Sequence, residues 1–454
     1  MKRIVRLLGR GLLFLLVFLI AFSALQPVFT LNYNLAYENV RGGYLREKEN
    51  SLDAVYIGAS NVYAFWQSLF GWNEQGIAVW SYSFGSMPTA ALKYLLIEAH
   101  KTQPDAVFIF NLNIVKSNSP YGTMQDIHRS VDFLPFSNNK IRLINTLCDG
   151  AGFSGLDKLE FFFPIIRFHS NWSNPNTWTR LFTSDGYKSS LRSPLFFDTV
   201  KDVSASYVPT NQQTALPEEI ENCINDLLDY CDEQHLKVLF VKAPQAAGKK
   251  TLRRMNALED LVIARGYPCL DLLENIEETG IQFQTDFYNA NHTNIHGSLK
   301  FCRYLSEYLV KQYGFTDKRN QDGWESWNTA AAAYLEEARS YVLPFELTDE
   351  ARDYTLSIPS LKAPVIQGDS VLLQWDSSAG ADGYEIFRRS TDAAHTYAWQ
   401  SIATVEGNSA YTDPDLSWDM SYDYRVVPFS SLHGERMYGN FEIDGIHATA
   451  GGQE

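Results

Sequence analysis

Apolar positions in the middle of the chain form short runs that alternate with segments of helical periodicity. Five apolar runs of strand length are bounded by turn residues, at 54–57, 78–83, 106–110, 238–242 and 268–272. Segments with apolar residues three or four positions apart occupy 63–70, 89–100, 217–234, 251–265 and 298–313. This alternation predicts an α/β domain over residues 31–315, with a parallel sheet covered by helices on both faces.

Residues 116–216 interrupt this alternation with a long, irregular segment rich in aromatic residues. The segment is inserted between two sheet strands at the edge where parallel sheets bind their ligands. We therefore expect it to form a lid or a substrate wall, although a packing excursion without a substrate role fits the pattern too.

The pattern changes again toward the carboxyl end of the chain. Residues 316–360 predict a connector that contains an amphipathic helix over 324–342. Short alternating strands follow over 361–446, at 370–375, 383–388, 399–405, 410–411, 422–428 and 435–441. This spacing predicts an all-β sandwich that resembles a fibronectin type III domain, in which Trp375 is the core tryptophan and Tyr422 the corner tyrosine. We expect this domain to be a spacer or a binding module.

The first 30 residues combine a basic flank with a strongly apolar run. The basic residues are Lys2, Arg3, Arg6 and Arg10, and the apolar run extends from residue 11 to 22 and less purely to 29. This pattern is typical of exported proteins. It predicts a single-pass signal anchor that leaves the rest of the chain outside the cell, with a cleaved signal peptide and secretion as the alternative.

Composition narrows the possible partners. The 454 residues carry a net charge of −15, which argues against nucleic-acid binding and against broad docking on anionic lipids or wall polymers. The five cysteines lack the spacing of a zinc site or a disulfide framework, so we expect buried free thiols, no metal and no cofactor.

A Gly58-Ala59-Ser60 turn follows the first predicted strand and opens a helix. Such a turn lifts the serine hydroxyl above the sheet, and backbone N–H groups at the helix start can face an oxyanion. A serine that merely caps the helix fits the same pattern.

A second polar stretch, residues 285–298, opens the last predicted helix and contains His292. A histidine there can reach a serine at the sheet edge, take its proton and later return it. A preceding acid can hold the imidazole in the required tautomer. Ser60 and His292 thus predict acyl transfer through an acyl-serine.

The blocks Gly58-Ala59-Ser60, Gly85, Asn113 and Asp286 to Gly297 together resemble the SGNH (GDSL-type) hydrolase superfamily, which has a flavodoxin-like α/β fold. The resemblance covers residues 50–315 and is closest to the exported, membrane-anchored branch of DltD and polysaccharide O-acetylation proteins. It implies Ser60 as nucleophile and His292 as base. It also implies that the Ser60 N–H, Gly85 and Asn113 form the oxyanion hole.

His296 is a rival base within the last block. The chain departs from this family pattern at three places. The first block has Ala59 where the family has aspartate, and in the third block Asn111 competes with Asn113 for the oxyanion role. The usual aspartate three residues before the histidine is replaced by Asn289. We therefore expect Asp286 to be the third catalytic residue, or else a Ser–His dyad supported by Asn289 or a carbonyl.

Other polar residues are weaker candidates for substrate contacts. Lys242 ends a predicted strand at the same sheet edge, and four residues of the insertion mix aromatic and polar groups in a way that suits carbohydrate: Arg129, Arg167, His169 and Trp172.

These features predict a membrane-tethered serine esterase or O-acyltransferase. Its substrate would be the acyl groups, acetyl foremost, of a cell-surface polysaccharide. Water and a sugar hydroxyl both remain open as the second acceptor, and a transferase would need a membrane partner to deliver the acyl group. The alternative is a non-catalytic surface protein that binds glycan on the same scaffold, with Asn289 in place of the acid as its main support.

Overall fold

A computed structural model of the chain describes residues 2–31, 37–178, 197, 199–338, 341, 353, 355–392, 396–414, 416–417, 420–432, 435–442 and 444–449. Parts of the predicted insertion and of the predicted connector lie outside these residues.

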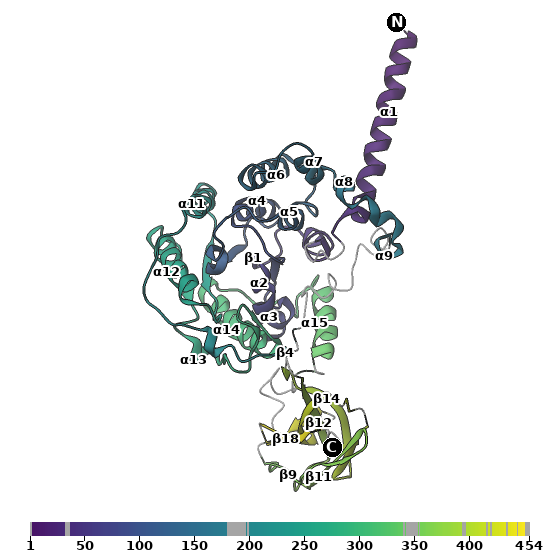
Figure 1. The fold of residues 1–454 in the computed structure, drawn as a ribbon, viewed down its shortest axis with the longest axis vertical. Helices are drawn as coiled ribbons and strands as arrows, with labels where there is room; N and C mark the ends of the chain where they lie inside the picture. Colours follow the sequence, from purple (N-terminus) through teal and green to yellow (C-terminus); the bar gives the residue numbers. More distant parts are fainter. Residues whose placement is uncertain are drawn as a thin grey trace, which may run out of the picture.

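A five-stranded, all-parallel sheet forms the centre of the first domain (Figure 1). Its order is β2-β1-β3-β5-β6, and the strands are β1 (Ala54–Gly58), β2 (Val79–Ser83), β3 (Val107–Asn111), β5 (Val238–Lys242) and β6 (Cys269–Asp271). The first four strands are buried along their whole length, as expected for a parallel sheet covered on both faces. The predicted α/β fold is confirmed at this level.

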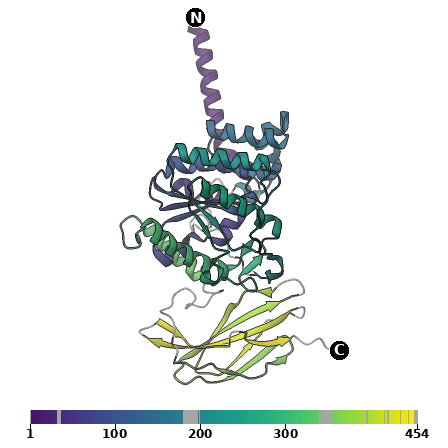
Figure 2. The same ribbon diagram turned by 90° about the vertical axis from the view of Figure 1, so that its left-hand side faces the viewer.

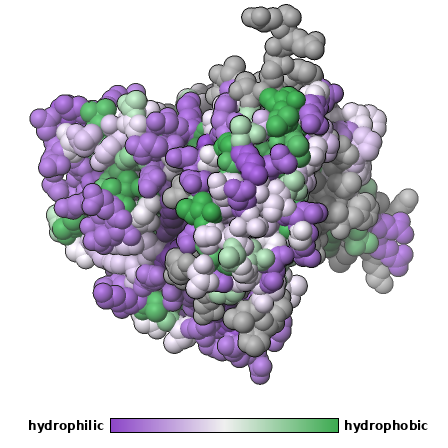
Figure 3. All heavy atoms as spheres, turned by 90° about the horizontal axis from the view of Figure 1, so that it is seen from below, coloured by the Kyte–Doolittle hydropathy of each residue, from purple (hydrophilic) through white to green (hydrophobic). Residues whose placement is uncertain are grey.

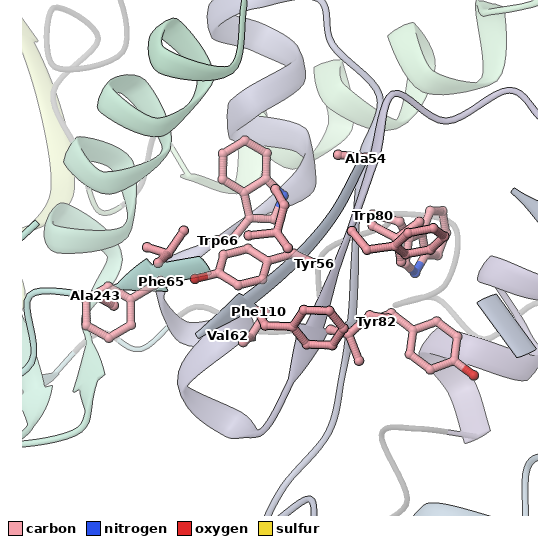
Figure 4. Packing of buried hydrophobic residues seen from close by; sticks show 14 of the residues in the cluster. Ala54, Tyr56, Val62, Phe65, Trp66, Trp80, Tyr82, Phe110 and Ala243 are labelled. Atoms are coloured by element: carbon pink, nitrogen blue, oxygen red, sulfur yellow. The ribbon is translucent and has the colours of Figure 1, made fainter. Parts of the chain in front are cut away.

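Helices cover both faces of this sheet, as Figures 1 and 2 show. They include α2 (Ser60–Phe65), α3 (Ser68–Gln75), α4 (Leu92–Thr102), α11 (Glu218–Glu233), α12 (Lys249–Ala264) and α14 (Ile295–Tyr313). Aromatic side chains fill the space between the layers, and Figure 4 shows Tyr56, Phe65, Trp66 and Phe110 packed around the first strands.

The sequence predicts one helix over 63–70, but the structure has two short ones, α2 and α3. The chain is extended at Trp66, where α2 ends. The indole of Trp66 donates a hydrogen bond to the carbonyl of Val79 at 3.2 Å. Its ring lies over Gly71, where an added Cβ would come within 2.3 Å of it. This aromatic packing interrupts the helix, and helical periodicity alone does not reveal it.

The first part of the predicted lid is a helical layer. It contains α5 (Met124–Val131), α6 (Asn138–Ala151), α7 (Gly155–Phe162), α8 (Ile165–Phe168) and α9 (Pro175–Trp178). Helix α6 packs on α4, and α8 and α9 contact the short helix Gln26–Phe29 near the start of the chain. The side chain of Asn171 donates to the carbonyls of Val28 and Thr30 at 3.1 and 2.8 Å. This layer therefore packs beside the amino-terminal segment.

Helix α1 (Lys2–Leu25) covers the basic and apolar segment at the start of the chain and projects from the domain (Figure 1). Within the described residues, no helix is both long and apolar enough to cross a membrane, so the predicted membrane span is not found.

Helix α15 (Glu325–Ala338), which we expected within a separate connector, packs as part of the α/β domain. Trp327 and Tyr334 are buried in the same core as the sheet residues. The Tyr334 hydroxyl also donates to Oε1 of Gln67 at 2.8 Å. The α/β domain therefore extends at least to residue 338.

The carboxyl-terminal region is an antiparallel β-domain. One sheet contains β9 (Ser360–Leu361), β10 (Val365–Gln367), β11 (Ser370–Asp376) and β15 (Ala410–Asp413). The other contains β12 (Gly383–Thr391), β13 (Thr396–Tyr397), β14 (Gln400–Glu406), β16 (Ser421–Leu432), β17 (Glu435–Tyr438) and β18 (Ile446–Thr449).

Two side chains predicted to mark this β-domain have the expected environment. Trp375 is 2% exposed and lies in the core. The hydroxyl of Tyr422 accepts a hydrogen bond from the backbone N–H of Ser417, five residues upstream, at 2.8 Å, which is the geometry of a corner tyrosine. The surface seen from the β-domain end is largely polar, with small separate apolar patches (Figure 3).

The five cysteines are all free, as expected, but only Cys148, Cys231 and Cys302 are fully buried.

Candidate active site

The candidate nucleophile lies at the carboxyl end of β1, which is paired on both sides in the sheet, with β2 and β3. Ala59 is the extended N-cap of α2, and Ser60 is the first residue of that helix. Ser60 is half-buried, whereas β1 and most of α2 are buried. The turn therefore holds a hydroxyl at the sheet edge where parallel sheets bind their ligands, as predicted.

His292 lies directly beside this hydroxyl. The two-stranded hairpin of β7 (Phe287–Asn289) and β8 (His292–Thr293) carries the histidine, and Nε2 of His292 is 2.8 Å from Oγ of Ser60. The hydroxyl of Thr293 donates to the carbonyl of Ala64 on α2 at 2.6 Å, which fixes the hairpin against the helix that begins with Ser60. The imidazole that contacts Ser60 is therefore that of His292, which the sequence favoured over the rival His296.

Asn289 takes the position of a third catalytic residue. Its Oδ1 is 2.8 Å from Nδ1 of His292 and also accepts the backbone N–H of Asn291 at 3.0 Å. The Asn291 N–H can only donate, so it fixes the carbonyl oxygen of the amide toward the imidazole. Nδ1 of His292 must then carry the proton, which leaves the lone pair of Nε2 free to accept the Ser60 hydroxyl proton.

Asp286, which we expected as the catalytic acid, is not brought to His292. Its buried carboxylate is 2.7 Å from Nζ of Lys300 and accepts the backbone N–H of Gln282 at 2.9 Å. Its backbone carbonyl accepts the N–H of Asn294 at 3.0 Å. Asp286 therefore organises the loop before α14, and the alternative of a Ser–His pair supported by Asn289 fits the geometry.

Burial and a neighbouring cation keep His292 neutral. Burial, followed by the charge of Lys116, lowers the pKa of His292 to about 4. Lys116 is held close by because its Nζ donates to Oδ1 of Asn291 at 2.8 Å. Near pH 7 the imidazole is therefore in the form that accepts a proton, although a base of such low pKa is a weak one.

The two predicted oxyanion groups follow β2 and β3, the strands on either side of β1. Gly85 follows β2 and is half-buried, and a Cβ added there would meet no atom within 4 Å. Asn113 follows β3 and is half-buried, whereas Asn111 is only 1% exposed and its Oδ1 accepts the N–H of Asn113 at 3.1 Å. Asn113 is thus more accessible than Asn111 to a substrate.

The polar residues that the sequence offered as weaker candidates for substrate contacts have other partners. Lys242 is 7% exposed, and its Nζ lies 2.8 Å from Glu259 and 2.6 Å from Asp271. It therefore has no free charge to offer an anionic substrate. Arg167 pairs with Glu160, and Arg129 pairs with Asp126.

Nδ1 of His169 donates to the carbonyl of Ile166 at 3.2 Å, and Trp172 is 65% exposed. Both residues belong to the helical layer near the start of the chain, so neither supports the predicted carbohydrate surface beside Ser60.

Phe197 is a site residue that the sequence did not reveal. Its ring stacks on Tyr288 with a centroid distance of 4.6 Å and lies 5.9 Å from the ring of His292. One phenylalanine among the many aromatic residues of the insertion carries no spacing signal that would place it there.

Comparisons with known proteins do not assign the chain to a family. No family model matches the sequence. No curated protein matches it either. Part of the chain is similar to the FN5 domain of Drosophila Lar, with 17% identity, 21% of this chain and 99% of that chain covered, and a TM-score of 0.17. A Fn3-like protein from Clostridium thermocellum shows 23% identity over 19% of this chain and 95% of its own, with a TM-score of 0.15.

A longer alignment joins the chain to BT4096, a gut microbial diltiazem-metabolizing enzyme. It covers 80% of this chain and 74% of that chain, with 8% identity and a TM-score of 0.17. Scores this low carry no argument about activity, so the function must be argued from the site itself.

Proposed function

We propose that this chain is an exported serine esterase or O-acyltransferase of SGNH type that acts on acyl groups of a cell-surface polysaccharide. The observation that carries the proposal is the 2.8 Å contact between Oγ of Ser60 and Nε2 of His292, with Asn289 fixing the tautomer. A serine that only caps a helix has no need of an oriented imidazole on its hydroxyl.

In the first step, Oγ of Ser60 attacks the acyl carbonyl carbon while His292 takes the hydroxyl proton at Nε2. The backbone N–H groups of Ser60 and Gly85 and the side-chain amide of Asn113 supply hydrogen bonds to the oxyanion. His292 then gives its proton to the departing alcohol, which leaves an acyl group on Ser60. Water or a sugar hydroxyl releases this group by the same steps in reverse.

Export is part of the proposal and is based on the basic flank and apolar run at the start of the sequence. The β-domain, with the buried Trp375 and the corner hydrogen bond of Tyr422, supports a fibronectin type III-like module. Such modules are common in cell-surface proteins.

The test compares the full-length chain with its Ser60→Ala variant in 4-nitrophenyl acetate hydrolysis and in labelling by a serine-directed fluorophosphonate. We expect both signals to depend on Ser60, and His292→Ala to remove the labelling as well. Added acceptor sugars would then separate transfer from hydrolysis. If a folded wild-type chain shows neither signal, the alternative of a non-catalytic glycan-binding protein, which Asn289 favours, gains the stronger support.

A further inference from the structure

Three aromatic rings form a row beside the Ser60–His292 pair. Tyr63 lies on α2, three residues after Ser60, and its ring stacks on Phe197 at a centroid distance of 6.4 Å. Phe197 in turn stacks on Tyr288 of β7 at 4.6 Å. We name Tyr63, Phe197 and Tyr288 the aromatic shelf.

The aromatic shelf is not ordinary core. Tyr63 and Phe197 are half-buried and Tyr288 is 38% exposed, whereas Val62, next to Tyr63, and Phe287, next to Tyr288, are fully buried. Aromatic side chains that keep exposed faces next to a reactive centre offer an apolar surface to a ligand.

The backbone at and just after Phe197, the middle residue of the aromatic shelf, is held from two sides. The backbone N–H of Ile295, at the start of α14, donates to the carbonyl of Phe197 at 2.9 Å. Two residues further on, β4 (Thr199–Val200) pairs with β13 of the β-domain, with Val200 opposite Thr396 and Thr199 opposite Tyr397. One sheet of the β-domain therefore continues into the segment that carries Phe197.

The same segment also forms backbone hydrogen bonds with β7, a strand of the hairpin that carries His292, and with the residues just before it. The N–H of Lys201 donates to the carbonyl of Phe287 at 2.8 Å, and the N–H of Val203 donates to the carbonyl of Phe283 at 2.9 Å. Strand β4 thus lies between the β-domain and β7, the strand that ends at Asn289. A continuous run of backbone pairing joins the β-domain to the site.

We propose that the aromatic shelf is the subsite for a sugar ring of the acyl-bearing polymer, and that pairing of β4 with β13 makes the β-domain hold it in position. This inference rests on the proposed function. The C–H face of a pyranose ring is apolar and fits the face of an aromatic ring. Phe197 is the specificity residue, and the β-domain acts through it as a positioning element.

The first test measures the sugar preference with the full-length chain. The two substrates are glucose pentaacetate, which has a pyranose ring, and vinyl acetate, which has no ring. We expect Phe197→Ala to raise KM for the sugar ester about three- to tenfold, the value of an aromatic stacking contact. The rate of fluorophosphonate labelling at Ser60 is measured in the same variant, and the rise in KM for the sugar ester should exceed any change in that rate.

Two further variants at position 197 separate stacking from bulk. Phe197→Tyr keeps an aromatic ring and should retain the wild-type KM for the sugar ester. Phe197→Leu keeps apolar bulk without a ring and should behave like Phe197→Ala. A wild-type KM in Phe197→Leu would overturn the stacking role.

The second test perturbs the pairing from the β-domain side. Side chains directly opposite each other on antiparallel strands interact, and Val200 lies opposite Thr396. The two aspartates of Val200→Asp/Thr396→Asp should therefore repel each other, whereas Val200→Lys/Thr396→Asp places opposite charges together. We expect the first double variant to raise KM for glucose pentaacetate and the second to restore it. Should the first double variant not fold, single Thr396→Asp compared with Val200→Lys/Thr396→Asp gives the same contrast.

The matched control is Gln367→Asp/Ser370→Asp, an opposed pair on β10 and β11 in the other sheet of the β-domain. It should leave both KM values unchanged. Equal KM values in the two charge variants at 200 and 396 would overturn the role of the β-domain.

The two proposals fail in different ways. If turnover depends on Ser60 but Phe197→Ala leaves the sugar KM unchanged, the aromatic shelf is wrong and the proposed function stands. If the wild type turns over neither ester, saturation-transfer NMR of glucose pentaacetate with the Ser60→Ala chain still tests the aromatic shelf. Binding to Ser60→Ala that is lost when Phe197→Ala is added supports the aromatic shelf, and equal binding with and without Phe197→Ala refutes it.

Discussion

Replacing Asn289 by aspartate tests the site most directly, because it adds one charge without changing the shape of the side chain. Oδ1 of Asn289 accepts the Nδ1–H of His292 at 2.8 Å and the N–H of Asn291 at 3.0 Å, and a carboxylate can accept both. The variant therefore restores an acid at the position where the geometry has an amide.

The expected shift follows from the charges involved. Burial and Lys116 lower the pKa of His292 to about 4, against an ordinary value of 6.5. Two unit charges about 4 Å apart attract by about 4 kcal/mol at an effective dielectric constant of about 20. Desolvation of the half-buried carboxylate offsets about half of this. The net gain of about 2 kcal/mol raises the pKa by about 1.5 units, since one unit corresponds to about 1.4 kcal/mol.

The assay is the pH profile of fluorophosphonate labelling and of kcat/KM for 4-nitrophenyl acetate between pH 3 and 8. The acid limb should move up by about 1.5 units, and the plateau should rise about fivefold because the imidazolium formed in the transition state is stabilised. Asn291→Asp is the comparison, because it places the same charge on Lys116 and not on the imidazole, and its acid limb should move less than that of Asn289→Asp. An acid limb that does not move in Asn289→Asp would refute the assignment of Asn289 as the partner of His292.

Three further predictions concern the same region. Asp286→Asn should lower the free energy of unfolding in urea by about 2 kcal/mol, because it removes a buried carboxylate from its pairs, and should leave the labelling rate unchanged. If Asp286 were the catalytic acid, the variant would instead slow the labelling and leave the stability unchanged. Asn113→Ala should lower kcat about 10²-fold as an oxyanion donor, whereas Gly85→Ala should keep wild-type kcat because its Cβ meets no atom within 4 Å and its N–H is retained. The pKa of His292 is about 4 in the folded chain and 6.5 in the unfolded chain, so between these pH values the unfolded chain binds the proton more readily. The contribution of neutral His292 to the free energy of unfolding is therefore complete above pH 6.5 and is lost as the pH falls toward 4. His292→Gln should therefore reduce the loss of unfolding free energy between pH 7 and 4.5, and an unchanged loss would contradict the pKa assignment.

The sequence by itself determined the parallel sheet and the residues at its edge. Strands buried on both faces must be continuously apolar, so the runs that became β1, β2, β3 and β5 were visible in the hydrophobic pattern. The places of Ser60, Gly85 and Asn113 follow from this, because each comes just after the end of a strand and parallel strands bring those ends to one edge.

Only the tertiary structure decided which side chains meet at that edge. The choice between Asp286 and Asn289 depended on how residues 282–294 fold, because Lys300 and the Gln282 N–H draw Asp286 away while the β7–β8 hairpin turns Asn289 toward His292. The role of Phe197 depended on β4 pairing with β13, nearly 200 residues away in the chain. Local patterns report the burial and conformation of a segment, whereas pairing between distant segments arises from packing of the whole chain and leaves no periodic signal in either segment.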